Sequence, residues 1–163
     1  MAEFFQWFVL LHIVGLVIFA VCHGVSMFVA FRIRPMRDAR PIAAAMEASS
    51  AAIGPMYLGL LLLIVGGLGA AAGGNLWTQP WIIASAIVLV VILAVMYMVA
   101  TPYYVRVRQA VGAQVRGKPP EGPPASPEEL AALLDTRRPE ILLLVGGGGL
   151  VILLWLMVLR PTL

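Results

Sequence analysis

The sequence predicts an all-α, polytopic membrane protein: a four-transmembrane-helix bundle, in a single domain over residues 1–163, with both termini outside. Apolar residues make up 61% of the chain and charged residues 12%, against about 45–50% and about 25% in soluble domains. Four long apolar stretches hold almost no ionisable side chains, and basic residues gather between them. So small a chain cannot bury this much apolar surface, and we therefore expect it to face lipid.

The first expected span covers residues 4–31 and is longer than a bilayer core. It is interrupted only by Gln6, His12, His23 and Ser26, and a group of arginines follows it directly. As a helix it would be about 42 Å long, against about 30 Å of hydrocarbon. We therefore expect it to tilt, or its ends to protrude from the hydrocarbon.

Spans two and three, residues 55–73 and 80–101, are expected to form an antiparallel hairpin. Pro55 suits the first turn of a helix, and the six residues from Gly74 to Gln79 allow only a tight turn. The small residues 41–52 before them are expected to form a separate short helix at the interface. The three tyrosines toward the far end of span three are typical of the headgroup region; they are Tyr97, Tyr103 and Tyr104.

Span four is expected at residues 139–159, after a proline-rich cytoplasmic loop at residues 109–138. Proline-rich segments without apolar periodicity are extended and solvated. Within this loop, the sequence Ser-Pro-Glu-Glu from Ser126 matches a capping box with proline at the first helical position. It predicts a short helix whose Leu130 and Leu134 lie against the membrane surface.

Positive charges predict the orientation. Ten of the eleven Lys and Arg residues flank span one, span three and span four on one side, and only Arg160 lies on the other. The positive-inside rule assigns the charged loops to the cytoplasm, so both termini face the periplasmic or outer side. No basic segment is interleaved with aromatic residues, so nucleic acid is not an expected partner despite the net charge of +3.

Glycines are concentrated in spans two and four, where small residues let helices approach closely in lipid. We expect them to pack helices within the bundle. A dimer seam, or a slot for a flat ligand between helices, is the alternative, and the run of four glycines also permits a local kink. The packing glycines are Gly66, Gly69, Gly73, Gly146, Gly147, Gly148 and Gly149.

Span one carries both histidines of the chain, and they share one stripe. His12 and His23 are eleven residues apart, which returns to within about 20° of the same direction on a helix. Cys22, Ser26 and Met27 border them. Ionisable groups inside a membrane are expensive and indicate a functional site by default, so this stripe is the candidate site and should face the bundle interior.

The stripe leaves several chemistries open. Each histidine could donate one hydrogen bond across the bundle, or His12 or His23 could be an axial ligand of haem b. The two lie about 16 Å apart along the helix, so they cannot both ligate one iron. A haem would then need a single histidine, a partner chain or one of four methionines, namely Met56, Met96, Met98 and Met157. Copper could bind His23, Cys22 and Met27, since imidazole and sulfur suit Cu(I).

Short motifs across nearly the whole chain also resemble one family. They are Leu11-His12-Ile13, His23-Gly24-Val25-Ser26, Ala30-Phe31-Arg32-Ile33-Arg34, Met56-Tyr57, Thr101-Pro102-Tyr103-Tyr104 and Trp155-Leu156-Met157. They resemble bacterial predicted integral membrane proteins classed as domain of unknown function 2269. The resemblance implies four spans in a bacterial inner membrane and no established activity. A looser likeness, through Leu11-His12 alone, is to four-helix membrane haem proteins and copper-resistance membrane proteins.

The function we expect is therefore a non-enzymatic one. Apart from Glu140 at the start of span four, no Asp or Glu lies within a span, and no catalytic or metal-cluster motif appears. The first hypothesis is an accessory or structural subunit of a membrane complex, or a homo-oligomer, with lipid and other subunits or its own copies as partners. The alternatives are a haem-binding or redox protein using His12 or His23, and a small transporter or copper-handling protein.

Overall fold

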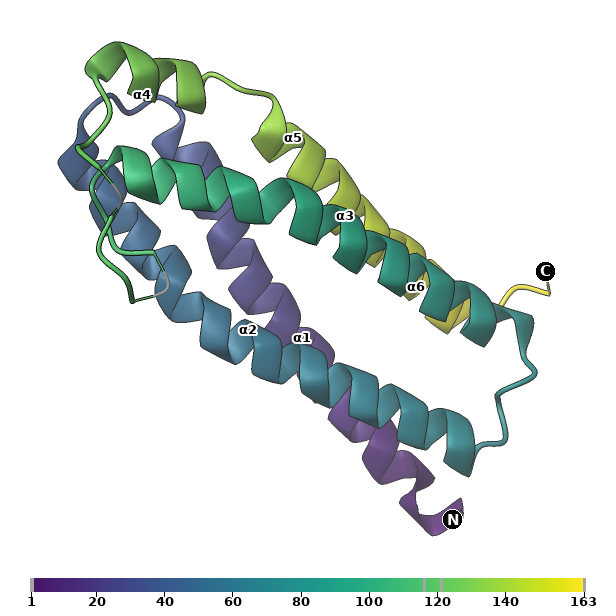
Figure 1. The fold of residues 1–163 in the computed structure, drawn as a ribbon. Coiled ribbons are helices and arrows are strands. Elements are labelled where there is room, and N and C mark those ends of the chain that lie inside the picture. The colour runs from purple at the N-terminus through teal and green to yellow at the C-terminus, as the bar shows by residue number, and fades with distance from the viewer. Residues whose placement is uncertain (1, 116, 121, 163) are drawn as a thin grey trace.

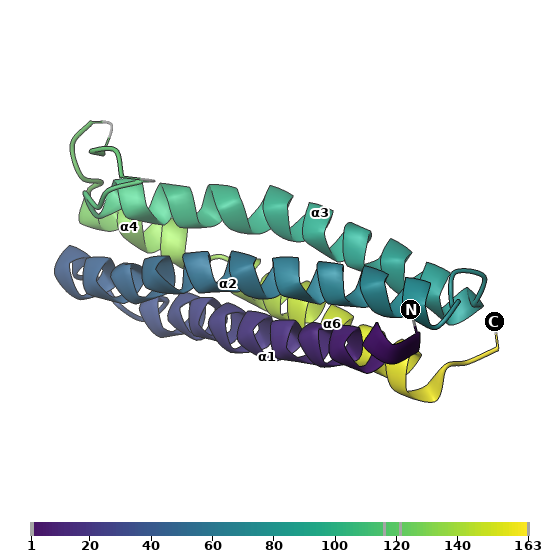
Figure 2. The same cartoon turned by 90° about the horizontal axis from the view of Figure 1, so that it is seen from below.

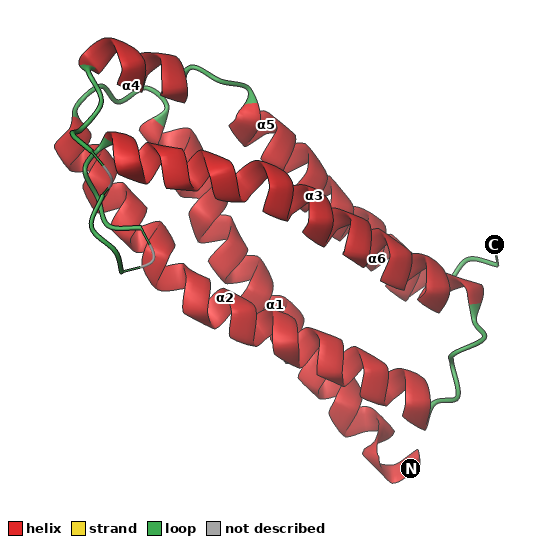
Figure 3. Ribbon diagram, in the orientation of Figure 1, coloured by secondary structure: helices red, strands yellow, loops and turns green. Residues whose placement is uncertain are grey.

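The computed structural model is an all-helical bundle (Figures 1 and 3) and describes residues 2–115, 117–120 and 122–162. Arg116, which contributes to the charge asymmetry, lies outside the described residues. Within them the helical elements are α1 (Ala2–Ile33), α2 (Ala39–Gly73), α3 (Pro80–Ala110), α4 (Pro127–Leu134), α5 (Arg138–Leu142), the π-helical η1 (Leu143–Gly147) and α6 (Gly148–Leu159).

Four described helical stretches are long and apolar enough to cross a membrane, which confirms the predicted fold class. They are Phe4–Ile33, Ala39–Gly73, Pro80–Ala110 and Pro127–Leu159. The second of them, α2, has 35 residues, so it is about 52 Å long against about 30 Å of hydrocarbon. The long helices should therefore extend beyond the bilayer core.

The helices form two antiparallel hairpins (Figures 1 and 2). α1 packs along α2, and α3 packs along the continuous rod of α5, η1 and α6. Both termini and the turn at residues 74–79 lie at one end, here called the terminal end. The turn after α1, the segment between α3 and α4, and α4 itself lie at the other, here called the loop end.

The expected helix start at Pro55 is wrong, because Pro55 lies inside the continuous helix α2. A proline within a helix loses one hydrogen bond and crowds the preceding turn. Here Gly54 before it has no neighbouring atom in the way, so the backbone is free to adjust locally. Ile42 and Met46, in the extra turns, are fully buried in the core. Their burial favours one long helix over a separate interfacial one.

The packed core lies at the loop end, where all the longer helices and α4 meet. Its members are Val29, Ala30, Ile33, Ile42, Met46, Tyr103, Val107, Val111, Leu130, Leu134 and Leu142. The predicted capping box of α4 is confirmed: Ser126 Oγ accepts from the Glu129 amide at 3.2 Å and the Glu129 carboxylate accepts from the Ser126 amide at 2.8 Å. The expectation that Leu130 and Leu134 face the membrane surface is wrong, because both pack into this core.

The proline-rich segment before α4 is not extended, contrary to expectation. The Ala125 amide donates to the Ala110 carbonyl at 2.9 Å, so the segment returns to the end of α3. Gly112, Gly117 and Gly122 have φ values of 70°, 76° and 86°, which glycine adopts without steric cost. Turns at these glycines fold the segment back on itself.

Candidate functional site

The α1–α2 contact is a close approach of backbones at glycines. A Cβ built on Gly66 would lie 2.8 Å from His12 Cα, and one on Gly59 would lie 2.6 Å from the Phe19 amide nitrogen. Gly69 packs flat against the Phe8 ring, and Gly73 lines a shallow apolar hollow beside it. The structure thus places these glycines of α2 against α1 of the same chain.

The glycine run of span four divides into two pairs. Gly146 faces His23 of α1 and Gly149 faces Ile92 of α3. Gly147 approaches only Leu143 of its own helix, and Gly148 has open space around it. The irregularity that the run permits is the π-helical segment η1, which ends at Gly147. Such segments occur often at functional sites.

His12 forms a hydrogen bond between the two helices of the first hairpin. Its Nδ1 lies 2.7 Å from the Leu63 carbonyl oxygen. A carbonyl only accepts, so Nδ1 carries the proton. The imidazole reaches this carbonyl beside Gly67, where a Cβ would lie 3.0 Å from Nδ1. His12 therefore matches the interpretation of a histidine that links two helices.

His23 has a different environment. Its ring stacks on Phe19, with centroids 5.5 Å apart and planes within 8°. Among the described residues its Nε2 is buried and has no hydrogen-bond partner. A Cβ on Gly146 would lie 2.7 Å from this Nε2 and 3.6 Å from the methyl group of Met96. His23 of α1, Met96 of α3 and Gly146 of η1 therefore meet at the contact between the two hairpins.

The remaining stripe residues separate from the two histidines. Ser26 accepts two hydrogen bonds: its hydroxyl oxygen accepts from Ser49 Oγ at 3.1 Å, and its carbonyl accepts from the Tyr104 hydroxyl at 2.7 Å. Met27 packs against the loop-end core. Cys22 is a half-buried free thiol. The stripe is thus one face of α1 that meets different partners along its length.

Two contacts of α3 with the first hairpin were not predicted from the sequence: Tyr104 bonds to Ser26 of this stripe, and Arg108 bonds to α2. Both lie on one face of α3, four residues apart, and Arg108 Nη2 donates to the Met46 carbonyl at 3.4 Å. The assignment of Tyr103 to the headgroup region is wrong, because its side chain is fully buried in the core; Tyr97, at 65% exposed, does point outward. The spacing of Tyr104 and Arg108 is a signal in the sequence, but their contacts depend on how α3 meets the first hairpin.

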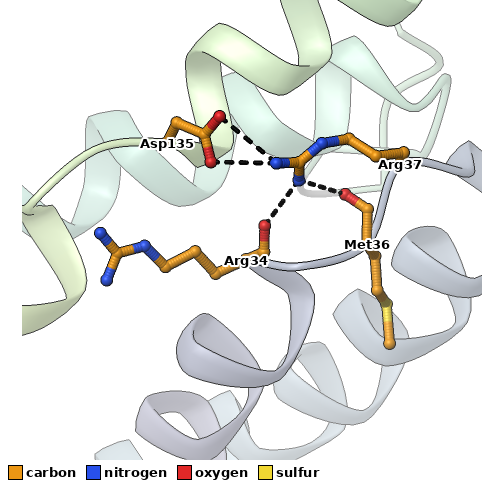
Figure 4. Close-up of polar contacts among 4 residues, drawn as sticks. All are labelled: Arg34, Met36, Arg37 and Asp135. Atoms are coloured by element: carbon orange, nitrogen blue, oxygen red, sulfur yellow. Dashed lines mark hydrogen bonds and ion pairs between the residues drawn. The ribbon is translucent and has the colours of Figure 1, made fainter.

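Two ion pairs join the hairpins at the loop end. Arg34 pairs with Glu140 of α5. Arg37, between α1 and α2, donates from Nη2 to both carboxylate oxygens of Asp135 at 3.1 and 3.3 Å (Figure 4). Its Nη1 also donates to the carbonyls of Arg34 and Met36 at 2.8 and 2.9 Å. The pairs are partly exposed, so each contributes little stability alone. Both pairs lie where the loop ends of the two hairpins meet.

The two hairpins are therefore linked by polar contacts at one end only. In the described part of the chain, the hydrogen bonds and ion pairs between α1–α2 and α3–α6 are those of Tyr104, Arg108, Arg34 and Arg37. All four lie at the loop end or in the turns next to it. Toward the terminal end, contact between the hairpins is sparse.

A porphyrin does not fit at His23 with the helices in these positions. A haem bound through Nε2 needs a ring-wide gap next to that atom, but Nε2 is buried, and even a single Cβ built on Gly146 would lie 2.7 Å from it. Among the described residues, no group of three His, Cys, Asp or Glu side chains could hold a metal ion. A metal at His23 would therefore have to be compact and would need another type of ligand.

Four described helical stretches that are long and apolar enough to cross a membrane define a polytopic membrane protein. The chain belongs to the family described as predicted integral membrane protein (DUF2269), which matches residues 6–161. The resemblance noted from the short motifs is thereby confirmed. Comparisons with curated proteins and with solved structures gave no significant match.

Proposed function

We propose that this protein is a non-catalytic component of a membrane assembly, either an accessory subunit or a homo-oligomer. The observation that supports this most is the uneven contact between its hairpins. Each hairpin is packed internally, whereas the two are linked by polar contacts only at the loop end. Their terminal halves therefore offer apolar helix faces that the chain does not itself cover.

Two such faces, here called apolar stripes to distinguish them from the polar stripe of α1, have residues at helical spacing. On α1 the stripe consists of Leu10, Val14, Val17 and Val21, between 41% and 63% exposed. On α3 it consists of Ile83, Ile87 and Val90, between 50% and 65% exposed. Such faces are already stable in contact with lipid, so burying apolar surface contributes little free energy to helix association in a membrane. A partner helix would gain mainly from close packing against them.

Native mass spectrometry of the protein released in mild detergent tests this proposal. We expect a complex of defined mass above the monomer, and we expect Val14→Trp or Ile87→Trp to reduce it by adding bulk to a stripe. Phe28→Trp is the matched control, since Phe28 is 68% exposed on the loop-end half of α1. A lipid-bound monomer alone, or equal yields of complex from all the variants, would refute the proposal.

For location we propose a bacterial inner membrane with the loop end in the cytoplasm and both termini on the periplasmic side. All described basic residues except Arg160 lie toward the loop end, and positive charge favours the cytoplasmic side. Reporter fusions at the C-terminus should behave as external, and fusions at Gly117 as cytoplasmic. The reverse pattern would overturn the orientation.

A further inference from the structure

The unpartnered nitrogen of His23 is unusual within this protein. His12, on the same stripe of α1, satisfies one ring nitrogen on the Leu63 carbonyl. Nε2 of His23 is buried and has no described partner. Leaving such a group unsatisfied costs about 1–3 kcal/mol, and in native proteins each instance requires an explanation. Nε2 therefore links no two helices by a hydrogen bond to a described residue, and it is free to bind a ligand.

We propose that His23 and Met96 bind a single Cu(I) ion at the contact between the two hairpins. Met96 belongs to α3, and its methyl group lies beside the same point, next to Gly146, as His23 Nε2. The thioether side chain has three rotatable bonds, so its sulfur is free to turn toward the imidazole. The stacked Phe19 ring limits rotation of the imidazole and keeps Nε2 directed at this point.

The available ligands select the class of metal. Thioether sulfur is a soft donor that suits Cu(I), and imidazole nitrogen also binds copper. Mg²⁺ and Ca²⁺ require oxygen ligands, and no Asp or Glu lies in the apolar part of α1, α2 or α3. Zn²⁺ usually takes four ligands, at least three of them from the protein, and no group of three suitable side chains exists in the described residues. A monovalent ion also has less charge to desolvate in an apolar bundle than a divalent one.

The backbone next to His23 also suits a compact ion. A Cβ at residue 146 would lie 2.7 Å from Nε2, so any residue but glycine would fill the space beside the imidazole. Gly146 lies in the π-helical segment, and Gly148, two residues further along the chain, faces open space. This pair supplies a matched test: an added methyl group at position 146 should block the ion, and one at position 148 should not.

The experiment is an anaerobic competition titration of the purified full-length protein with Cu(I) against a chromophoric Cu(I) chelator. We expect one Cu(I) per chain. Met96→Leu and His23→Ala should each weaken binding by more than the roughly 10–100-fold typical of removing an outer-shell partner, and Gly146→Ala should weaken it as well. Met98→Leu, His12→Ala and Gly148→Ala should leave it unchanged. X-ray absorption should show one sulfur and at least one nitrogen ligand.

Several outcomes would overturn the site. They are no Cu(I) binding by the wild type, binding that Met96→Leu and His23→Ala leave intact, and binding that depends on Cys22 alone. Incorporation of haem that His23→Ala abolishes would assign Nε2 to iron instead. Met96→Leu keeps the volume of the side chain close to that of methionine, so it remains informative if His23→Ala fails to fold. The site does not depend on the proposed function, because oligomeric state and Cu(I) binding are measured separately.

Discussion

Replacing Gly66 by alanine tests whether the two helices of the first hairpin meet at their backbones. A Cβ at position 66 would lie 2.8 Å from both His12 Cα and the Phe8 carbonyl oxygen. Both atoms belong to the α1 backbone, so no rotamer change can relieve the contact, and the helices must separate. Separation would also lengthen the hydrogen bond from His12 to the Leu63 carbonyl, now 2.7 Å.

The magnitude follows from three effects. Overpacking costs about 1–3 kcal/mol. Loss of an interhelical hydrogen bond in a membrane adds about 0.6 kcal/mol, and the better helix propensity of alanine returns up to about 1 kcal/mol. We therefore expect Gly66→Ala to destabilise the protein by about 1–3 kcal/mol in the free energy of unfolding.

The matched control is Gly24→Ala in the partner helix α1. Nothing lies within 4 Å of a Cβ at Gly24, so the propensity effect dominates, and this variant should be neutral or slightly stabilised. Both free energies of unfolding can be measured by titrating detergent-solubilised protein with a denaturing detergent and following helicity by circular dichroism. If Gly66→Ala were no less stable than Gly24→Ala, the close approach of α1 and α2 would be wrong.

Three further predictions concern other contacts. Tyr104→Phe removes the donor to the Ser26 carbonyl and should cost about 0.6–1.7 kcal/mol in denaturing-detergent titrations, whereas the same change at the exposed Tyr97 should cost nothing measurable; equal effects would argue against the contact. Leu134→Ala should lower the free energy of unfolding by about 2–5 kcal/mol and release α4 from the core. Limited proteolysis should then cleave the segment before α4 faster than in the control Glu128→Ala. An unchanged cleavage rate would contradict the docking of α4. Protein expressed with excess haem should show no Soret band that depends on His23, because the contact at His23 leaves no room for a porphyrin; a band lost in His23→Ala would refute that conclusion.

The sequence alone determined the number of spans, the asymmetry of charge and the start of α4. These depend on local properties: the apolar length needed to cross a bilayer, the position of basic residues relative to the spans, and three or four adjacent residues that form a capping box. Ser126 and Glu129 satisfy each other regardless of the rest of the fold. Local patterns of this kind can be identified without knowing which helices are neighbours.

Tertiary structure decided what each residue of the stripe contacts. His12 and His23 lie on the same face of α1, yet one meets the α2 backbone and the other meets η1 and Met96 of the second hairpin. The difference arises because different helices contact α1 at different positions along its length. The residue pattern within α1 does not indicate which helix lies at each position. Burial in the tertiary structure also accounts for the continuation of α2 past Pro55. It likewise accounts for the position of Tyr103 and Leu134 in the core. Their partners come from segments far apart in the chain, so only the assembled bundle shows them.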